Sequence, residues 1–303
     1  MKKDCILYLG NGFDVACGLK TKYSQFIESD IYFQLEKTNA LAHWIKSQYN
    51  KDKDRWSDLE ELIFYYSLYL QNSYRDYSSL QRATAIFQEE FKQLSLALQD
   101  YISDQSKGEH PKYISMLIDS WNDLLKIEGI CCFNYTPFPV LMKLLPNYNK
   151  LYRIHGALTP TIKVPTIRIK LGIDRCMKVC PEHSFLYKDN MPNYTPGIWT
   201  EPDNRLIAAA KITNEPIYPA FYNAEVIIIY GCSLGRSDTA YFKYLFSNAK
   251  TQRIIIYHFG ENEEIIFRRR VPELTDDNDI YKRIRFIDSS KDNGYLRNLE
   301  QFL

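Results

Sequence analysis

The chain has no long apolar run. No stretch approaches the roughly 18 to 20 residues that a membrane-spanning helix requires, and Met1-Lys2-Lys3-Asp4 leads into a short apolar run rather than a secretory signal. An excess of charge is also absent, because 38 Lys and Arg face 37 Asp and Glu. With a formal net charge of +1, no bulk field draws the protein toward nucleic acid or anionic lipid. We therefore expect a cytoplasmic protein, with neither a membrane nor a nucleic acid as its partner.

The seven cysteines lack the pattern of a disulfide framework or a zinc site. They are odd in number and scattered, and Cys5, Cys131 and Cys132 lie within apolar runs, where a reduced thiol behaves as a small hydrophobe. Cys176 and Cys180 are spaced C-x-x-x-C, and no second pair follows to complete a tetrahedral zinc site. We expect reduced thiols and no bound metal.

Glycine and proline are almost absent between about residues 24 and 126. Leu, Gln, Glu, Tyr and Lys are abundant there, and apolar residues recur at helical spacing. Examples of this spacing are Leu59, Leu62, Ile63 and Tyr66, and then Leu80, Ala83, Phe87, Phe91 and Leu94. The pattern predicts three to five helices that form an all-helical insertion or lid over residues 24–126.

Short β-type runs lie on both sides of this helical region, and most of them end at turn-forming residues. The runs cover residues 5–9, 130–133, 151–154, 167–171, 225–230, 253–257 and 283–287. Helical segments are expected near 238–249, 262–270 and 290–302. Strands that alternate with helices predict a parallel sheet covered on both faces. We expect an α/β protein with a Rossmann-like core formed by residues 1–23 and 127–303.

The first β-type run ends at Gly10-Asn11-Gly12, followed by Phe13 and Asp14. Ligands bind outside the carboxyl ends of strands in open parallel sheets. Glycine allows a tight turn and close approach to a phosphate, and a following helix N-terminus supplies positive potential. The run therefore predicts a phosphate cradle, with a plain tight turn as the alternative. A carboxylate beside phosphates costs energy, so we expect Asp14 to face a ribose hydroxyl, a base amide or a developing cation.

Two further strand ends carry polar side chains. Asn134, followed by Tyr135 and Thr136, offers two donors and one acceptor group on a short arm, which suits a hydroxyl or a water. A turn-forming Asn before a proline is the alternative. His155 follows another run, and a histidine near its ordinary pKa can take a proton from a hydroxyl or water. A purely structural histidine is the alternative there.

The fourth strand end is the loop Gly231-Cys232-Ser233-Leu234-Gly235. Two glycines and a small hydroxyl suit a second loop along a dinucleotide. The alternative is a strand-to-helix connection capped by Ser237 or Asp238.

Together these motifs resemble those of the sirtuin-like superfamily of NAD-binding proteins. Its members carry a G-A-G-x-S-x-x-x-G-I-P turn, then T-Q-N-x-D, then H-G, then G-x-S-L. The matching residues, in the same order, are Gly10, Gly12, Gly18 and Leu19, then Asn134, then His155 and Gly156, then Gly231, Ser233 and Leu234. The resemblance implies a sirtuin-like core with NAD as substrate or ligand. The residues that would bind it are Gly10, Asn11, Gly12, Phe13, Gly18, Tyr135, Thr136, Gly231, Ser233, Leu234 and Asp238.

Two positions depart from the sirtuin pattern. The Asp that closes the second motif, which is associated with nicotinamide capture, is Thr136 here, and the Ser of the first motif is Asp14. Sirtuin deacylases also hold zinc on two C-x-x-C pairs, which this chain lacks. We therefore expect no acyl-lysine peptide as substrate, and Asp14 could replace the missing carboxylate.

The chain resembles the AbiH-type abortive-infection family of bacterial anti-phage proteins more closely. Openings of that family look like I-G-N-G-F-D-x-x-x-G-L-x-T-x-Y-x-x-F, and W-x-D-x-E, N-Y-T, H-G and G-x-S-L-G-x-S-D follow. The chain matches the opening at 9–14, Gly18, Leu19, Thr21, Tyr23 and Phe26, and the second motif at Trp56, Asp58 and Glu60. The resemblance implies an anti-phage function, with a phage-derived trigger and a homo-oligomer as open possibilities.

The leading hypothesis is an NAD glycohydrolase, which cleaves the nicotinamide–ribose bond of NAD with water as the acceptor. Asn134 would hold a ribose hydroxyl or the attacking water, and His155 would be the general base. Asp14 would stabilise the cationic transition state or hold the nicotinamide amide.

Two alternatives stay open. One is a sensor that binds NAD or ADP-ribose without cleaving it. The other is an effector that acts on nucleic acid, for which a nuclease would need clustered carboxylates. The acidic clusters at 58–61 and 276–279 are better explained as a helix surface and a solvated loop.

Overall fold

The computed structural model describes residues 2–51, 77–105, 112–134, 151–153, 221–235, 238–290 and 301–303, together with 59, 62–63, 66, 69–70, 73 and 299. The expected strand at 167–171, most of the expected helix at 290–302 and most of the W-x-D-x-E motif lie outside these residues.

Six parallel strands form one sheet in this part of the chain. They are β1 (Lys3–Leu9), β2 (Leu125–Cys132), β3 (Leu151–Arg153), β4 (Val226–Tyr230), β5 (Arg253–His258) and β6 (Ile284–Asp288). Their order in space is β3-β2-β1-β4-β5-β6. The last residue of β1, Leu9, lies beside Cys132 of β2 on one side and Tyr230 of β4 on the other. The expected α/β class with a parallel sheet is therefore confirmed.

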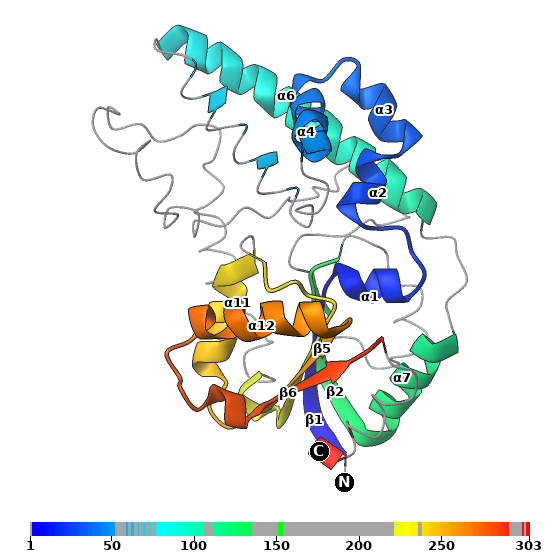
Figure 1. The fold of residues 1–303 in the computed structure, drawn as a ribbon, viewed down its shortest axis with the longest axis vertical. Helices are drawn as coiled ribbons and strands as arrows, with labels where there is room; N and C mark the ends of the chain where they lie inside the picture. The colour runs from blue at the N-terminus through cyan, green and yellow to red at the C-terminus, as the bar shows by residue number, and fades with distance from the viewer. Residues whose placement is uncertain are drawn as a thin grey trace.

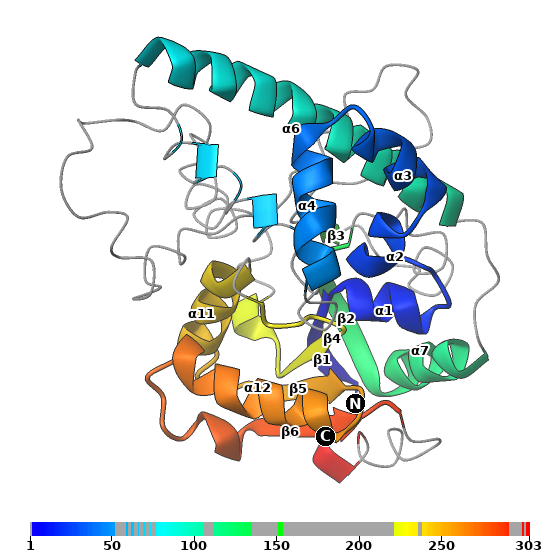
Figure 2. The ribbon, with the colours of Figure 1, turned by 45° about the horizontal axis from the view of Figure 1, so that its top comes forward.

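The central strands carry continuous apolar runs, as expected where helices cover both faces of the sheet. All five residues of β4 and residues 254–258 of β5 are buried. Helices α11 (Thr239–Asn248) and α12 (Glu261–Leu274) pack on one face, and α1 (Asn11–Ala16) and α7 (Lys112–Leu124) pack on the other. The views in Figures 1 and 2 show these layers around the sheet.

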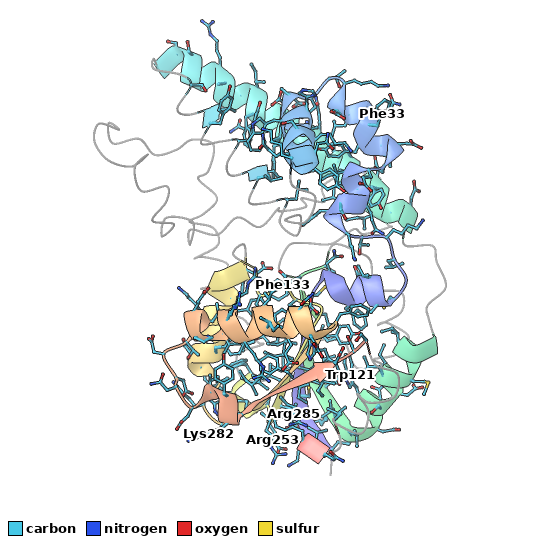
Figure 3. All side chains as sticks on the ribbon, in the orientation of Figure 1. Phe33, Trp121, Phe133, Arg253, Lys282 and Arg285 are labelled. Atoms are coloured by element: carbon cyan, nitrogen blue, oxygen red, sulfur yellow. The ribbon has the colours of Figure 1, made fainter. Side chains whose placement is uncertain are left out.

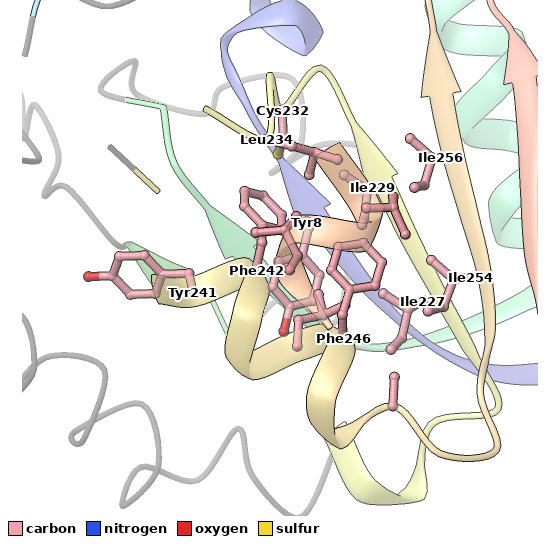
Figure 4. Close-up of a cluster of buried hydrophobic side chains, with 14 of the residues drawn as sticks. Tyr8, Ile227, Ile229, Cys232, Leu234, Tyr241, Phe242, Phe246, Ile254 and Ile256 are labelled. Atoms are coloured by element: carbon pink, nitrogen blue, oxygen red, sulfur yellow. The ribbon is translucent and has the colours of Figure 1, made fainter. Parts of the chain in front are cut away.

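Successive residues of β1 point to opposite faces, as the pleat requires. Ile6 and Tyr8 belong to the core under α11 and α12, whereas Cys5, Leu7 and Leu9 belong to the core under α1 and α7. Figure 4 shows the first of these cores, with the side chains of β4 and β5 facing those of α11.

Besides the sheet and its covering helices, the structure contains a separate group of helices, the helical body, which has a core of its own. It contains α2 (Tyr23–Ile27), α3 (Asp30–Glu36), α4 (Ala40–Lys51) and the long helix α6 (Tyr77–Gln105). Inside it, the buried hydroxyl of Tyr32 donates a hydrogen bond to the carbonyl of Ala42 at 2.8 Å. These helices lie on the side of the sheet to which the carboxyl ends of the strands point (Figures 1 and 2). None of the described helices is both long and apolar enough to span a membrane.

Helix α7 packs on the sheet, although its residues fall within the expected insertion 24–126. Its fully buried Trp121 lies 6.5 Å from Phe13 between ring centroids, and its indole N–H donates to the hydroxyl of Tyr257 at 3.4 Å. In Figure 3, the side chain of Trp121 lies between its own helix, α7, and the sheet, whereas Phe133 lies near α11. The core of the helical body therefore draws on residues 26–102 and not on α7.

Helix α12 contains a proline, Pro272, in its interior. Proline has no N–H, so the carbonyl of Arg268, four residues earlier, has no helical donor. The hydroxyl of Tyr281 donates to this carbonyl at 2.6 Å. A side chain from the segment that leads to β6 thus satisfies the backbone group that the proline leaves open.

Tyr281→Phe is expected to lower the free energy of unfolding by about 1 kcal/mol, because this bond is lost. In a Pro272→Ala background the alanine N–H can bond to Arg268, so the same substitution should cost clearly less there. Urea denaturation of the four proteins measures both costs. Equal costs in the two backgrounds would show that Tyr281 does not compensate for the proline.

Candidate functional site

Two of the polar residues expected after strands, Asp14 and Asn134, meet where the strand order reverses. Strands β2 and β3 lie on one side of β1, and β4, β5 and β6 lie on the other. The segment after β1 forms α1 on one face, whereas the segment after β4 leads to α11 on the other. In open α/β sheets, the crevice outside the carboxyl ends at such a reversal is the usual position of a ligand.

The turn after β1 packs backbone to backbone against the loop after β4. The N–H of Gly10 donates to the carbonyl of Tyr230 at 2.9 Å, and the N–H of Gly12 donates to the carbonyl of Gly231 at 2.8 Å. A Cβ atom on Gly12 would lie 2.6 Å from Cα of Gly231. Glycine is therefore required here by the contact between the two loops. These two N–H groups bond to β4 and its loop, and the phosphate cradle remains a prediction.

The spacing between Gly12 and Gly18 follows from the length of α1. Gly18 has φ of 85°, and its N–H donates to the carbonyl of Val15 at 2.9 Å. The N–H of Leu19 donates to the carbonyl of Asp14 at 3.0 Å. This pair of bonds is a Schellman motif, in which glycine adopts the left-handed conformation after a helix. Gly18 thus has a structural role that explains its place in the motif.

The centre of the site is a buried pair formed by Asp14 and Asn134. Asp14 lies in α1, Asn134 follows β2, and they are 4% and 2% exposed. The side-chain Nδ2 of Asn134 donates to Oδ1 of Asp14 at 2.8 Å. The backbone N–H of Asn134 donates to the thiol sulfur of Cys132 at 3.3 Å. Adjacent strands bring the two residues together, since the N–H of Phe133 continues the ladder to the carbonyl of Leu9.

The other amide atom of Asn134, Oδ1, is buried and has no hydrogen-bond partner among the described residues. Buried polar atoms in native proteins almost always have a partner, so each exception needs an explanation. A ligand donor is one such explanation. The expected role of Asp14 as a group that faces a ligand stays a prediction. The structure shows a different contact, in which the carboxylate of Asp14 holds the side chain of Asn134.

Two expected ligand contacts are core residues. Phe13 is buried, and its ring meets Tyr230 edge-on at 5.4 Å between centroids. Leu234 is buried in the core under α11 and α12, with φ of 50°. Their side chains hold the two loops on the sheet, and any ligand contact would come from their backbone.

The remaining predicted residues lie around this centre or outside the described residues. Asn11 is exposed, and its Nδ2 donates to the carbonyl of Thr21 at 3.0 Å. Ser233 is exposed, and its carbonyl accepts a hydrogen bond from Arg270. Asp238 occupies the N-cap position of α11 without a capping bond from its side chain. Tyr135, Thr136 and His155 lie outside the described residues.

Sequence reasoning gave no role to Thr21 or Cys132. Thr21 is buried, and its Oγ1 is a second buried polar atom without a partner among the described residues. Its place in the motif after Gly18 was the available signal. Cys132 looked like one more small apolar residue, and its contact with the N–H of Asn134 had no signal in the sequence.

Three of the thiols near the site are not nucleophiles. Burial, together with the charge of Asp14, raises the pKa of Cys17 to about 12. Burial also raises the pKa of Cys131 to about 12 and that of Cys232 well above its usual value. Only the thiolate is reactive, so these groups are inert at neutral pH. Among the described cysteines, Cys5, Cys131 and Cys232 are free thiols in the buried core, as expected for reduced thiols.

A second polar cluster lies at the carboxyl end of β5. Nδ1 of the buried His258 is 2.9 Å from the carbonyl oxygen of Gly260, and Nε2 is 3.4 Å from a carboxylate oxygen of Glu264. Burial raises the pKa of the neighbouring Glu263. Both ring nitrogens of His258 have partners, which indicates a structural histidine.

A family model described as "Bacteriophage abortive infection AbiH" matches residues 6–259. This range contains the turn after β1, the Asp14–Asn134 pair and the loop after β4. A search of curated proteins finds no match. Because the match covers most of the chain, this protein belongs to the AbiH family of bacteriophage abortive-infection proteins.

Proposed function

We propose that this AbiH protein acts in abortive infection by hydrolysing the nicotinamide–ribose bond of NAD. The family implies the defence role, and the site suggests the chemistry. The observation that carries the proposal is the buried Asp14–Asn134 pair at the reversal of the strand order. The order β3-β2-β1-β4-β5-β6 is also that of the Rossmann dinucleotide-binding sheet, which supports a sirtuin-like NAD site.

The described residues suit a reaction that passes through a cationic sugar. Cleavage of the nicotinamide–ribose bond develops positive charge on the ribose, and a fixed carboxylate nearby stabilises that charge. Asp14 supplies the carboxylate, and Oδ1 of Asn134 accepts a hydrogen bond from a ribose hydroxyl or the attacking water. In this proposal His155 takes the proton of that water. Ser233 and the turn at 10–12 lie along the phosphates.

In this proposal the helical body covers the site at the carboxyl ends of the strands. It lies on the side of the sheet to which the strand ends point, and α2 follows α1 after a short connection (Figure 1). A cover over the reacting bond excludes water other than the attacking molecule and can gate access to the site.

The direct test is to incubate the purified protein with NAD and to follow nicotinamide by chromatography, with and without lysate from phage-infected cells as a source of a trigger. We expect the wild type to release nicotinamide, and Asn134→Ala and His155→Ala to release far less. If NAD binds but no nicotinamide appears under any of these conditions, the hydrolase proposal is wrong.

A second candidate function is a sensor that holds NAD or ADP-ribose intact. Thr136, in place of the carboxylate associated with nicotinamide capture, favours it. An unchanged nucleotide that stays bound through purification would support the sensor. For a metal-dependent nuclease, the described residues contain no group of three or more His, Cys, Asp or Glu arranged to hold a metal ion. That alternative gains no support from this part of the chain.

A further inference from the structure

We infer that Asp14 is a positioning residue that fixes the amide orientation of Asn134, so that the site selects a ligand that offers a hydroxyl. The identity of that ligand as a ribose nucleotide rests on the proposed function. The orientation itself rests on contacts between the two side chains.

An asparagine amide can present either of two chemically opposite faces. Its oxygen accepts hydrogen bonds and its nitrogen donates them, and a half-turn about the last side-chain bond exchanges the two. A site that binds through an asparagine therefore has no fixed preference unless a neighbour holds the amide. Asp14 is that neighbour, at 2.8 Å.

An ionised carboxylate only accepts hydrogen bonds. The amide nitrogen of Asn134 must therefore face Asp14, and the amide oxygen must face away from it. The reversed orientation would place an amide oxygen against a carboxylate oxygen and would lose a charge-assisted bond in a buried position. Both side chains are at least 96% buried, so water does not offer a substitute partner.

The backbone at Asn134 is held as well. Its N–H donates to the thiol of Cys132, and the preceding N–H of Phe133 donates to the carbonyl of Leu9. With the backbone and the amide nitrogen both fixed, the direction of Oδ1 is set before any ligand arrives. Preorganisation of this kind reduces the ordering cost of binding.

The fixed oxygen determines which ligand groups fit. Oδ1 is buried and has no partner among the described residues, so it needs a donor. A ribose hydroxyl or a hydroxyl-bound water supplies one, whereas a phosphate or carbonyl oxygen would be repelled. Oγ1 of Thr21 is also buried without a partner among the described residues, but it gives no such direction because a hydroxyl both donates and accepts. The pair therefore favours ligand groups that donate a hydrogen bond, and on a ribose these groups are the hydroxyls.

The test compares the binding of ADP-ribose with that of its analogues that lack one hydroxyl of the ribose distal to the adenine, by titration calorimetry on the full chain. For the wild type, loss of the hydroxyl that meets Oδ1 should weaken binding about tenfold, as loss of one hydrogen bond does. In Asp14→Asn the two amides can pair in either direction. The dissociation constant of the analogue divided by that of ADP-ribose should therefore fall toward one.

The matched control is the exchanged pair Asp14→Asn with Asn134→Asp. There the carboxylate at position 134 accepts from the amide at position 14 and still presents an acceptor to the ligand. The exchanged pair should therefore regain the preference for the hydroxyl that Asp14→Asn loses. Thermal unfolding of each variant reports whether the fold is retained.

The outcomes separate a positioning role from a merely structural one. If Asp14→Asn weakens all ligands equally and keeps the wild-type ratio, Asp14 only supports the fold and the inference is wrong. A wild type that binds none of these nucleotides, or binds all equally, also overturns it. If the hydroxyl preference follows the pair but NAD is never hydrolysed, the inference stands and the hydrolase proposal fails.

Discussion

Gly231→Ala is expected to lower the free energy of unfolding by about 2–5 kcal/mol. We expect no other glycine-to-alanine substitution at the site to destabilise the fold more. Gly231 has φ of 69°, a conformation that costs energy for a residue with a side chain. Its added Cβ would also lie 2.1 Å from the backbone nitrogen of Phe13 and 2.5 Å from the carbonyl carbon of Gly12. These are backbone atoms at the start of α1, so one of the two loops must move.

Gly260→Ala is the matched control for this prediction. Gly260 also has a positive φ, 78°, but a Cβ there would meet no atom within 4 Å. Its substitution should therefore cost only the backbone conformation, about 1–3 kcal/mol. Urea denaturation of both variants isolates the cost of the close contact as the difference. If the two costs are equal, the loops after β1 and β4 do not pack as tightly as described.

Asn134→Ala is expected to lower kcat for NAD hydrolysis by about 10²–10³-fold, the range found when one fixed polar contact to a transition state is removed. The substitution deletes the acceptor that Asp14 orients, and it leaves the loop backbone in place. KM should change much less, because in this account the phosphates are held elsewhere. Steady-state kinetics with NAD separates the two constants.

Asn39→Ala controls for the loss of a buried asparagine as such. Asn39 is buried in the helical body, where its amide bonds to the carbonyl of Glu90 and to the N–H of Ala42. Its substitution should lower stability and leave kcat nearly unchanged. If both variants lose kcat to a similar extent, the loss reflects reduced stability, and Asn134 has no role in catalysis.

The central strands β4 and β5 could be predicted from the sequence because they are buried on both faces. Residues 226–230 and 254–257 form continuous apolar runs that end at turn or polar residues, and the structure places strands there. The place of α7 was harder to predict. Its apolar stripe is typical of any amphipathic helix, and only the tertiary structure shows that the stripe, with Trp121 at its centre, packs on the sheet.

The sequence predicted the candidate site as a set of strand ends, but it did not predict the contacts between them. Asp14 and Asn134 are 120 residues apart, and nothing local indicates that the carboxylate of one holds the amide of the other. The glycines at 10 and 12 signalled a turn, yet their requirement comes from Gly231, which lies far along the chain. Phe13 matched a motif, and its burial against Tyr230 depends on the fold of the sheet.

The most direct test of this account is a crystal structure of the protein with bound ADP-ribose. The account predicts the ligand at the carboxyl ends of β1 and β4, with a ribose hydroxyl or its bound water within hydrogen-bond distance of Oδ1 of Asn134. Nδ2 of Asn134 should keep its bond to Asp14. A nucleotide bound at another edge of the sheet, or one that leaves Oδ1 without a donor, would contradict the account.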